Sequence, residues 1–495
     1  MFRLQLRLTA RPLAALAVCG AAAFMGGPAG VPVLAASLPV PVPTVAEYQF
    51  LSAGTTPPTE PECFAAGRRC FTAAAMENSY NLAPLYTAGD KGQGVTIAII
   101  DSFGNPNMAS DLANFNTQMN LPHMCGEPGQ ACGAGAPTFQ HVFWNGKTEV
   151  KSPPPNSKDP GLQTRNAWAL ETSLDVEWAH AIAPMANILN VTTNPAETQG
   201  VQGFPTMMDA EQFIVDNHQA TVITQSFGAT EEGFGGTQSL LNLRHAFVSA
   251  AANGVTMLAS SGDGGSANSK KTPVPNPSTV PYPTVIWPAS DPLVTAVGGT
   301  YLCTNPVTGA GVDSTDPPAT CQANPGVREV GWIDSGGGFS HVFAKPGYQD
   351  TLPAGSTSIG AMRGVPDVAF QASSRTGPLV YDTAPGDAQG GLGCSGSPCS
   401  AGWYVVGGTS CSSPEFSGLV AIADQIAGHG LGQINPTLYK LASGPNYATY
   451  FYDVTTGNNQ TDPSIPGYPA TAGWDPVTGL GTPNAATLVP ALAAG

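Results

Sequence analysis

The sequence predicts an α/β protein in which a mostly parallel central sheet is flanked by helices on both faces. From about residue 79 to residue 495, short runs rich in β-branched residues alternate with helix-like segments, and no fixed-period repeat is visible. Strands that alternate with helices are typical of parallel sheets covered on both faces. Several aspartates, serines and glycines stand directly after these runs. In such folds the active site gathers at the carboxyl ends of the strands.

The alternation contains five expected strands and three expected helices. The strands cover residues 95–101, 186–191, 220–228, 255–263 and 293–300, and the helices cover residues 166–182, 206–219 and 237–254. A further strand-like run at 403–406 ends in a Gly-Gly turn, before a helix that begins near Ser410. This order places Asp101, Ser226 and Asp263 at or just past strand ends.

Composition and charge narrow the classes of function. Of the 495 residues, 11% are charged and 42% apolar, which allows a sizeable core and argues against wholesale disorder. The formal net charge is −16 with 18 Lys and Arg residues, so nucleic acid and anionic membranes are disfavoured as partners. An acidic surface poor in lysine loses net negative charge as its carboxylates protonate. This behaviour is compatible with a protein that acts in mild acid.

The first 36 residues have the pattern of a secretion signal, in which arginines precede an apolar run and small residues follow. The run is short for a membrane span, so no stable membrane insertion is expected. We expect cleavage after Ala36, with a site near Ala29 or lipid attachment at Cys19 as alternatives. Residues 37–78 are a Pro- and Thr-rich N-terminal segment without a full pro-domain. Its first part, up to residue 62, is expected to be a linker or remnant.

Nine cysteines follow the expected signal, and eight of them form closely spaced pairs. The pairs are Cys63 with Cys70, Cys125 with Cys132, Cys303 with Cys321, and Cys394 with Cys399. Disulfides across such short loops fit an exported chain. Cys411 is left over beside Ser410. It is either a small buried hydrophobic residue, which we favour, or a reactive thiol.

Ser410, in GGTSCSSPEFSG (407–418), is a candidate nucleophile that needs a base to take its proton. Histidine is the usual base, but none of the seven histidines stands in a glycine-flanked, helix-opening context, and His180 is the nearest candidate. Glu171 and Asp175 fit better, because residues four apart share one face of a helix. Two acidic residues four apart more often lie on a solvent-exposed helix face, but here apolar residues border the pair.

Two further aspartates are candidates for the same site. Asp263 closes a strand in the glycine-rich stretch SSGDGG, and Asp101 ends the first strand. Each has an ordinary explanation as a turn residue. Their place at the predicted active-site edge is what favours a functional interpretation.

Three separated motifs together resemble the sedolisin family of serine-carboxyl peptidases: ETSLDVEWAHAIAP, SSGDGG and GGTSCSSPEFSG. Stretches such as YPTVIWPASDPLVTAVGGT and AGWDPVTGLGTPN extend the resemblance from about residue 79 to the C-terminus. It implies a subtilisin-like fold and peptide hydrolysis through an acyl-enzyme on Ser410. It further implies Glu171 as the base, Asp175 as the residue that orients Glu171, and Asp263 as the donor to the oxyanion. Some relatives keep an extra acidic residue at the position of Asp101.

The resemblance also implies one structural Ca²⁺ ion near the C-terminus. Its ligands would be the side chains of Asp453 and Asp475 and the carbonyls of Val454, Thr471 and Gly473. Calcium takes several carboxylate and carbonyl oxygens, but this spacing matches no helix-loop-helix calcium motif, and two surface turns are the alternative. No cluster of His, Cys and carboxylate indicates a catalytic metal.

A carboxylate base predicts activity in acid. Such a base has a reference pKa of about 4.3 and works best near that pH. Glu171 and Asp175 are expected to titrate as a pair. Asp263 can stabilise an oxyanion only while it is protonated, so activity is expected to fall as the pH rises through its pKa.

The sequence thus predicts a secreted, calcium-containing, monomeric acid endopeptidase (a serine-type peptidase) that acts on proteins or peptides. Three alternatives stay open: a tripeptide-releasing exopeptidase of the same family, a neutral serine protease with a histidine base, and an inactive secreted binding relative. Sedolisins typically have a large N-terminal pro-domain, whereas about 40 residues lie here between the expected signal and the catalytic domain. We therefore expect either unaided folding or an unusual route of activation.

Overall fold

The computed structural model describes residues 42–43, 47–153, 162–193, 203–268, 279–315, 317–384, 393–394, 397–398 and 401–495. These residues belong to one compact unit, Leu38–Gly495, and no division at residue 79 separates them. The expected secretion signal lies outside the described residues. So does the expected disulfide between Cys394 and Cys399.

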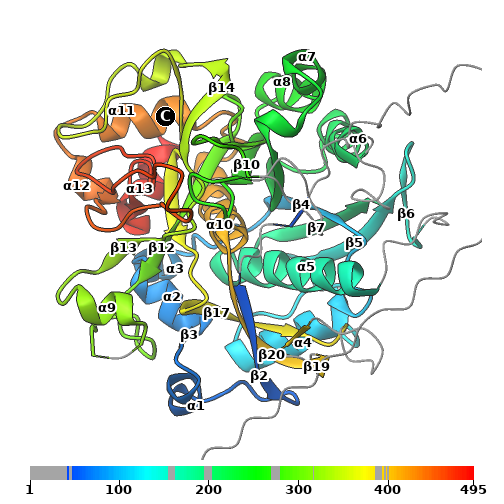
Figure 1. Ribbon diagram of the computed structural model, residues 1–495. Helices are drawn as coiled ribbons and strands as arrows, with labels where there is room; N and C mark the ends of the chain where they lie inside the picture. Colours follow the sequence, from blue (N-terminus) through cyan, green and yellow to red (C-terminus); the bar gives the residue numbers. More distant parts are fainter. Residues whose placement is uncertain are drawn as a thin grey trace, which may run out of the picture. The chain divides into compact units, whose positions relative to one another are not determined.

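A mostly parallel sheet forms the centre of this unit, which confirms the predicted α/β class (Figure 1). Among the described residues it has nine strands, in the order β13-β12-β10-β8-β4-β7-β5-β6, with β16 joined to β12. All of the pairs are parallel except β12 with β13 and β5 with β6. The strands are β4 (Thr96–Ser102), β5 (Phe139–Trp144), β6 (Glu149–Val150), β7 (Asn187–Thr193), β8 (Val222–Gln225), β10 (Thr256–Ser260), β12 (Thr295–Leu302), β13 (Glu329–Gly331) and β16 (Val368–Gln371).

Helices cover both faces of the central sheet, because neighbouring residues of a strand point to opposite faces. Ile97 and Ile99 of β4 pack in one core with α5 and α10, and Ala98 and Ile100 pack in the other with α6 and α8. No helix in the described ranges is long and apolar enough to cross a membrane. The helices are α1 (Glu60–Ala65), α2 (Ala73–Ser79), α3 (Ala83–Ala88), α4 (Met108–Met119), α5 (Leu162–Ile182), α6 (Gly203–Asp216), α7 (Thr237–Leu241), α8 (His245–Ala252), α9 (Ala319–Ala323), α10 (Thr409–Ala427), α11 (Asn435–Ala442), α12 (Tyr447–Tyr450) and α13 (Ala485–Ala493).

Two of the expected elements are each divided in two. The helix expected at 237–254 is broken between α7 and α8, where the Arg244 guanidinium is held by the Asp291 carboxylate. The strand expected at 220–228 ends as β8 at Gln225 and resumes as β9 (Phe227–Thr230). Ser226 lies at the break and donates a hydrogen bond to Asp175. In both cases a contact distant in sequence overrides local propensity.

β9 leaves the central sheet and joins a small sheet of its own. It pairs antiparallel with β11 (Ile286–Trp287) on one edge and with β1 (Val42–Pro43) on the other. In the register with β1, Val42 lies opposite Gly228 and Pro43 opposite Phe227. The N-terminal segment therefore lies along a strand that begins beside Ser226.

The expectation of a linker up to residue 62 is wrong for the described part of that segment. β2 (Glu47–Ala53) pairs antiparallel with β20 (Gly402–Gly407), the strand that precedes Ser410. The four-stranded sheet is completed by β17 (Thr376–Asp382) and β3 (Arg69–Phe71). The rings of Tyr48 and Phe50 both contact Tyr404 across the strands. β2 is stabilised by β20, which lies about 350 residues later in the sequence. The local sequence pattern therefore did not predict this strand.

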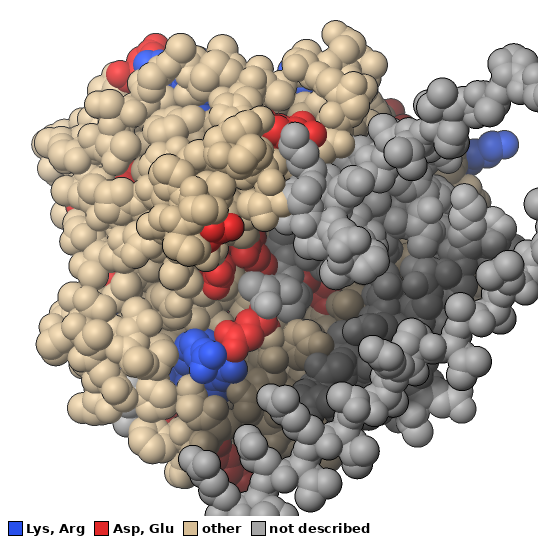
Figure 2. Space-filling model, viewed as in Figure 1, with Lys and Arg blue, Asp and Glu red and all other residues tan. Residues whose placement is uncertain are grey.

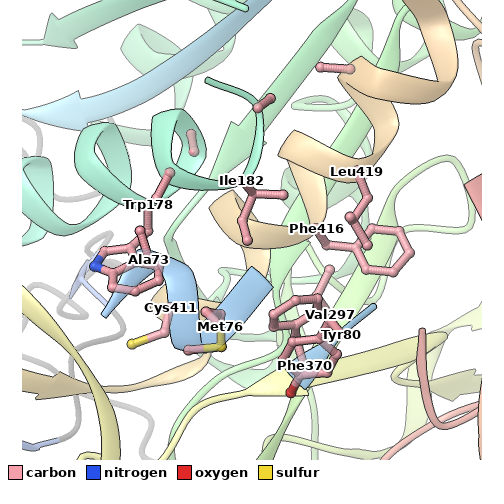
Figure 3. Close-up of a cluster of buried hydrophobic side chains, with 14 of the residues drawn as sticks. Ala73, Met76, Tyr80, Trp178, Ile182, Val297, Phe370, Cys411, Phe416 and Leu419 are labelled. Atoms are coloured by element: carbon pink, nitrogen blue, oxygen red, sulfur yellow. The ribbon is translucent and has the colours of Figure 1, made fainter. Parts of the chain in front are cut away.

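Three of the expected disulfides are confirmed: Cys63–Cys70, Cys125–Cys132 and Cys303–Cys321. Cys411 is a free thiol and is fully buried. Figure 3 shows it in the apolar cluster between α2, α5 and α10, near Met76. This environment supports the favoured interpretation of Cys411 as a small buried hydrophobic residue.

Candidate active site

The candidate base pair lies on α5, and the candidate nucleophile lies at the start of α10. Figure 1 shows these two helices side by side over the sheet. Glu171 and Asp175 are one turn apart on α5 and are fully buried, as the apolar neighbours in the sequence suggested. Ser410 is the second residue of α10 and is also fully buried. Its hydroxyl lies near the Glu171 carboxyl and lowers the pKa of that group.

Asp101 belongs to the same cluster. It lies near the end of β4 with its side chain fully buried, and its Oδ2 accepts a hydrogen bond from Asn190 Nδ2 at 2.8 Å. Its charge acts on both Glu171 and Asp175. The structure thus brings three carboxyl groups into one electrostatic network, and Asp101 is more than an isolated turn residue.

Asp263 reaches the site from the loop after β10. Its Oδ1 accepts two hydrogen bonds from Thr409, one from the backbone nitrogen at 2.7 Å and one from Oγ1 at 2.9 Å. Thr409 immediately precedes Ser410, and its Oγ1 in turn accepts from the nitrogen of Gly262 at 3.0 Å. Asp263 Oδ2 is buried and has no hydrogen-bond partner among the described residues. This second oxygen is available to carry a proton and donate it to a ligand.

Burial raises the pKa of each carboxyl in the cluster. The pKa of Glu171 is well above its usual value because of burial, an effect that the Ser410 hydroxyl opposes and the charges of Asp101 and Asp263 reinforce. The pKa of Asp175 is also well above its usual value, through burial and the charge of Glu171. Burial raises the pKa of Asp101 to about 7. Because these groups interact, they lose their protons in steps that belong to the cluster as a whole.

Burial also raises the pKa of Asp263, to about 8. The hydrogen bonds from Thr409 act against this shift, and the nearby Asp334 adds to it. A carboxyl with this pKa stays protonated throughout the acidic range. Asp263 is therefore suited to donate a hydrogen bond to a developing negative charge.

The histidine nearest to the site in sequence is occupied elsewhere. His180 lies at the other end of α5, and its Nε2 donates to the carbonyl oxygen of Pro122 at 2.9 Å. Burial lowers its pKa to about 4. His180 is thus engaged by a backbone carbonyl, whereas the Ser410 hydroxyl acts on Glu171.

Sequence reasoning missed the side chains that hold these carboxyls. Ser226 donates to Asp175 Oδ1 at 3.0 Å, Asn190 donates to Asp101, and Thr409 donates to Asp263. One signal was present for Asn190, one of two polar amides in the largely apolar run ANILNV. Figure 2 shows that acidic side chains also gather near the middle of one face of the molecule.

The five expected calcium ligands lie together in two adjoining loops. The nitrogen of Gly473 donates to both oxygens of Asp453, at 3.1 and 3.2 Å, and the nitrogen of Thr471 donates to Asp475 Oδ2 at 3.0 Å. Asp475 is fully buried, and burial raises its pKa to about 7. The carbonyls of Val454, Thr471 and Gly473 accept no hydrogen bond within the described ranges. Three unused carbonyls beside a buried carboxyl fit an oxygen-preferring cation.

The part of the chain that the structure describes contains no group of three or more His, Cys, Asp and Glu side chains arranged to hold a metal ion. A calcium site in these two loops would instead depend on two carboxylates and backbone carbonyls. Calcium accepts such mixed oxygen ligands.

The fold is that of the subtilisin-like peptidase family. Residues 92–433, more than half of the chain, match the model of the family described as "Subtilase family". The chain belongs to this family and, within it, to the sedolisin-type peptidases.

The individual relatives agree with this assignment. Kumamolisin of Bacillus sp. (strain MN-32) is 31% identical over 417 residues, which cover 82% of this chain and 61% of that protein. Tripeptidyl-peptidase SED1 of Arthroderma otae is 30% identical over 343 residues, which cover 63% of this chain and 45% of that protein. The chain therefore spans about half to three fifths of the length of these curated relatives.

A solved structure of Pseudomonas sedolisin, a serine-carboxyl proteinase complexed with two molecules of pseudo-iodotyrostatin, has the same fold. Its TM-score is 0.62, with 24% identity, 85% of this chain covered and 97% of the other. This likeness confirms the subtilisin-like arrangement that the sequence predicts.

Proposed function

We propose that this chain is a secreted serine-carboxyl endopeptidase that hydrolyses proteins or peptides in acid, through an acyl-enzyme on Ser410. One observation carries the proposal: the Ser410 hydroxyl adjoins the Glu171 carboxyl within a buried carboxyl network. A serine needs such an acceptor for its proton. Relatives named kumamolisin and sedolisin support a peptidase of this kind.

The first half of the reaction forms the acyl-enzyme. Ser410 Oγ attacks the carbonyl carbon of the scissile bond while its proton moves to Glu171. Asp175 shares that proton and orients Glu171, and Ser226 holds Asp175 in place. The oxyanion that forms accepts a hydrogen bond from protonated Asp263. When the C–N bond breaks, Glu171 returns the proton to the leaving amine.

The second half hydrolyses the ester on Ser410. Water attacks the acyl carbon and gives a proton to Glu171, and Asp263 again stabilises the oxyanion. Collapse of this intermediate releases the carboxylic acid and returns the proton to Ser410. The active site then regains its starting protonation.

The shifted pKa values set the expected pH range. Activity needs one proton removed from the Glu171–Asp175–Asp101 network and the proton of Asp263 retained. Because burial raises every one of these pKa values, we expect the maximum to lie above the reference pKa of about 4.3. The rate should fall as the pH approaches about 8, where Asp263 ionises.

The test is hydrolysis of a denatured protein by the purified enzyme between about pH 2.5 and 8, with Ser410→Ala and Glu171→Gln alongside. A single acidic maximum that both substitutions abolish would support the serine-carboxyl mechanism. A neutral maximum that survives Glu171→Gln would overturn the base assignment. A folded wild-type protein with no activity at any pH would favour the inactive binding relative or a missing activation step.

Endopeptidase action has one specific competitor, release of tripeptides from free N-termini. The name of the relative Tripeptidyl-peptidase SED1 favours this alternative. Blocking the substrate's N-terminus separates the two activities, because an endopeptidase cleaves the blocked peptide and a tripeptidyl-peptidase does not. We propose a monomer, and the three described disulfides support an exported protein.

We further propose that the two C-terminal loops hold one structural Ca²⁺ ion through Asp453, Asp475 and the carbonyls of Val454, Thr471 and Gly473. The unused carbonyls and the buried Asp475 carboxyl support this site. The ion would compensate the charge of the two carboxylates and tie the loops together. It would have no part in the chemistry at Ser410.

A further inference from the structure

The loop after β10, residues 262–266, carries Asp263 and is held on two sides by segments that are distant in sequence. On one side lies the segment 334–337. The nitrogen of Gly336 in this segment donates to the carbonyl oxygen of Gly262 at 2.7 Å. The backbone directly before Asp263 is therefore fixed by a contact outside the loop.

The other side of the loop is held from the C-terminal part of the chain. The hydroxyl of Thr461 donates to the carbonyl oxygen of Gly264 at 2.6 Å. The nitrogen of Ser266 donates to the carbonyl oxygen of Asn459 at 3.0 Å. A Cβ atom at Gly265 would lie 2.3 Å from that same carbonyl oxygen. The loop thus rests directly on the backbone of Asn459, at a distance that only glycine allows.

The side chain of Asn459 joins the two segments to each other. Its Nδ2 shares its two N–H groups among three carbonyl oxygens, those of Ser335 at 3.2 Å and of Gly337 and Pro476 at 3.3 Å each. Its Oδ1 accepts from the nitrogen of Tyr468 at 2.9 Å. The residue is fully buried. A single buried amide therefore links both sides of the loop that carries Asp263.

The position of Asp263 depends on these contacts, although the orientation of its side chain is set by Thr409. A donor stabilises an oxyanion only within a narrow range of distances, and a misplacement of about 1 Å can cost about 100-fold in rate. Glycines at 262, 264 and 265 give the loop little stiffness of its own. Without the amide of Asn459, the segments on its two sides could separate and let Asp263 move.

From these observations we infer that Asn459 is a positioning residue for the oxyanion donor: its backbone carbonyl and its side-chain amide hold Asp263 at the place where it can donate to the oxyanion. The inference rests on the proposed peptidase function. Asn459 would act through Asp263 and not on the substrate. A merely structural asparagine would contribute to stability alone, and the two roles predict different results in the following experiments.

The first experiment is a double-mutant cycle of Asn459→Ala and Asp263→Ala, measured as kcat and KM on one peptide in acid. Asn459→Ala alone should lower kcat by about tenfold to 100-fold and leave KM nearly unchanged, because the lost interaction is made in the transition state. In the Asp263→Ala protein, the same substitution should lower kcat by no more than about twofold. Equal losses of kcat in both proteins would overturn the inference and leave the peptidase function intact.

The second experiment needs no catalysis and follows the titration of Asp263 in the Ser410→Ala variant. The nitrogen of Thr409 donates to Asp263 Oδ1, so the amide resonance of Thr409 reports the protonation of that carboxyl. Burial raises the pKa of Asp263 to about 8. Adding Asn459→Ala should admit water to the loop and lower the midpoint of this titration. Glu171 and Asp334, whose charges also interact with Asp263, are retained in both proteins.

Asn435→Ala is the matched control for the titration. Asn435 is also a fully buried asparagine, and its Nδ2 donates to the carbonyl oxygen of Val294 at 3.0 Å. Its loss should lower the Tm without moving the midpoint. A midpoint that Asn459→Ala leaves unchanged would overturn the inference.

The titration also separates the inference from the proposed function. A lower midpoint in Asn459→Ala, with a wild type that cleaves no peptide, would support the positioning of Asp263 and count against the reaction alone. If Asn459→Ala does not fold, Asn459→Asp takes its place in both experiments. Aspartate keeps an acceptor for the nitrogen of Tyr468 and loses the amide donors.

Discussion

The two oxygens of Asp263 have different surroundings, which suits a residue that must be both held in place and protonated. Oδ1 accepts both hydrogen bonds from Thr409 and is thereby fixed to the start of α10. Oδ2 is buried without a hydrogen-bond partner among the described residues. A proton on Oδ2 would leave the contacts of Oδ1 intact. The proposed donor to the oxyanion is therefore oriented by the residue next to the nucleophile.

This division of roles predicts the behaviour of Asp263→Asn. The amide oxygen can accept from Thr409 as Oδ1 does, and the amide nitrogen can donate to the oxyanion at any pH. We expect Asn to retain part of the activity and to move the loss of kcat/KM to a pH above the value of about 8 expected for the wild type. Profiles of kcat/KM against pH for the wild type and the variant measure the shift.

The control is Asp263→Ala, which removes the donor and should lower kcat by about 100- to 1,000-fold below about pH 8, where Asp263 is protonated. If Asp263→Asn keeps the wild-type alkaline limb, that limb belongs to another group. Equal activity of the Ala variant and the wild type would remove Asp263 from the mechanism.

At the scale of the elements, a close contact sets the distance between α5 and α10. A Cβ atom at Gly418 of α10 would lie 2.7 Å from both Cβ and Cγ2 of Ile182 on α5. Carbon atoms are not found so close, so only glycine allows this approach. Since α5 carries Glu171 and α10 carries Ser410, the same contact controls the separation of the proposed base and the proposed nucleophile.

Gly418→Ala should therefore weaken both packing and catalysis. We expect a loss of about 1–3 kcal/mol in the free energy of unfolding, as overpacked cores show, and a lower kcat/KM in the fraction that stays folded. Urea unfolding and peptide hydrolysis measure the two effects separately. Ile426→Ala, an exposed position on the same helix, should change neither. A Gly418→Ala protein with unchanged stability and rate would contradict the role of this contact.

The proposed calcium loops predict a stability effect of chelation. The buried carboxyl of Asp475 is easier to keep ionised with a cation beside it. We expect EGTA to lower the Tm and added Ca²⁺ to restore it, whereas Mg²⁺ restores less because it demands a tighter octahedral shell. Asp453→Asn should weaken the response to Ca²⁺. If the Tm does not depend on Ca²⁺ in the wild type, the two loops are ordinary surface turns.

The whole molecule contains buried carboxyl groups that the catalytic site does not use. Glu211 on α6 and Glu415 on α10 are fully buried, and neither oxygen of either side chain has a hydrogen-bond partner within the described ranges. Burial raises the pKa of both well above the usual value. Neutral carboxyls tolerate such sites far better than ionised ones. These groups therefore make the folded state suited to acidic conditions, independently of the chemistry of the candidate site.

These groups predict that stability decreases as the pH rises. In the unfolded chain they titrate near about 4.3, and in the folded chain they keep their protons to higher pH. The folded state then binds more protons, so its stability is fully present below that value and is lost as the pH rises through the folded pKa. We expect the Tm of Ser410→Ala, which avoids self-digestion, to be lower at neutral pH than at pH 4. Scanning calorimetry across this range measures the slope.

Introducing Glu415→Gln into the Ser410→Ala variant should reduce the dependence of Tm on pH, because glutamine is neutral at every pH. The exposed Asp350→Asn is the matched control and should leave the slope unchanged. A Tm that is constant or rises toward neutral pH would show that these carboxyls do not govern the stability of the fold.

Much of the candidate site could be predicted because its signals are local. Glu171 and Asp175 are four residues apart, and Asp101 and Asp263 follow strand-forming runs. The orientation of Glu171 toward Ser410 could not be read in the same way, since the two positions are 239 residues apart in the sequence. The resemblance to a known family, more than any local pattern, linked them.

By itself, the sequence determined the alternation of strands and helices, the acidic pair on one helix face and the short disulfide loops. Each of these depends on residues close together in the chain, where periodicity and spacing are sufficient. Only the tertiary structure decided that β2 is a strand, that β9 leaves the central sheet at Ser226, and that Thr409 and Asn190 hold the carboxyls of the candidate site. These features depend on partners far away in sequence. Burial, which raises the pKa values of the site, is likewise a property of the packed molecule.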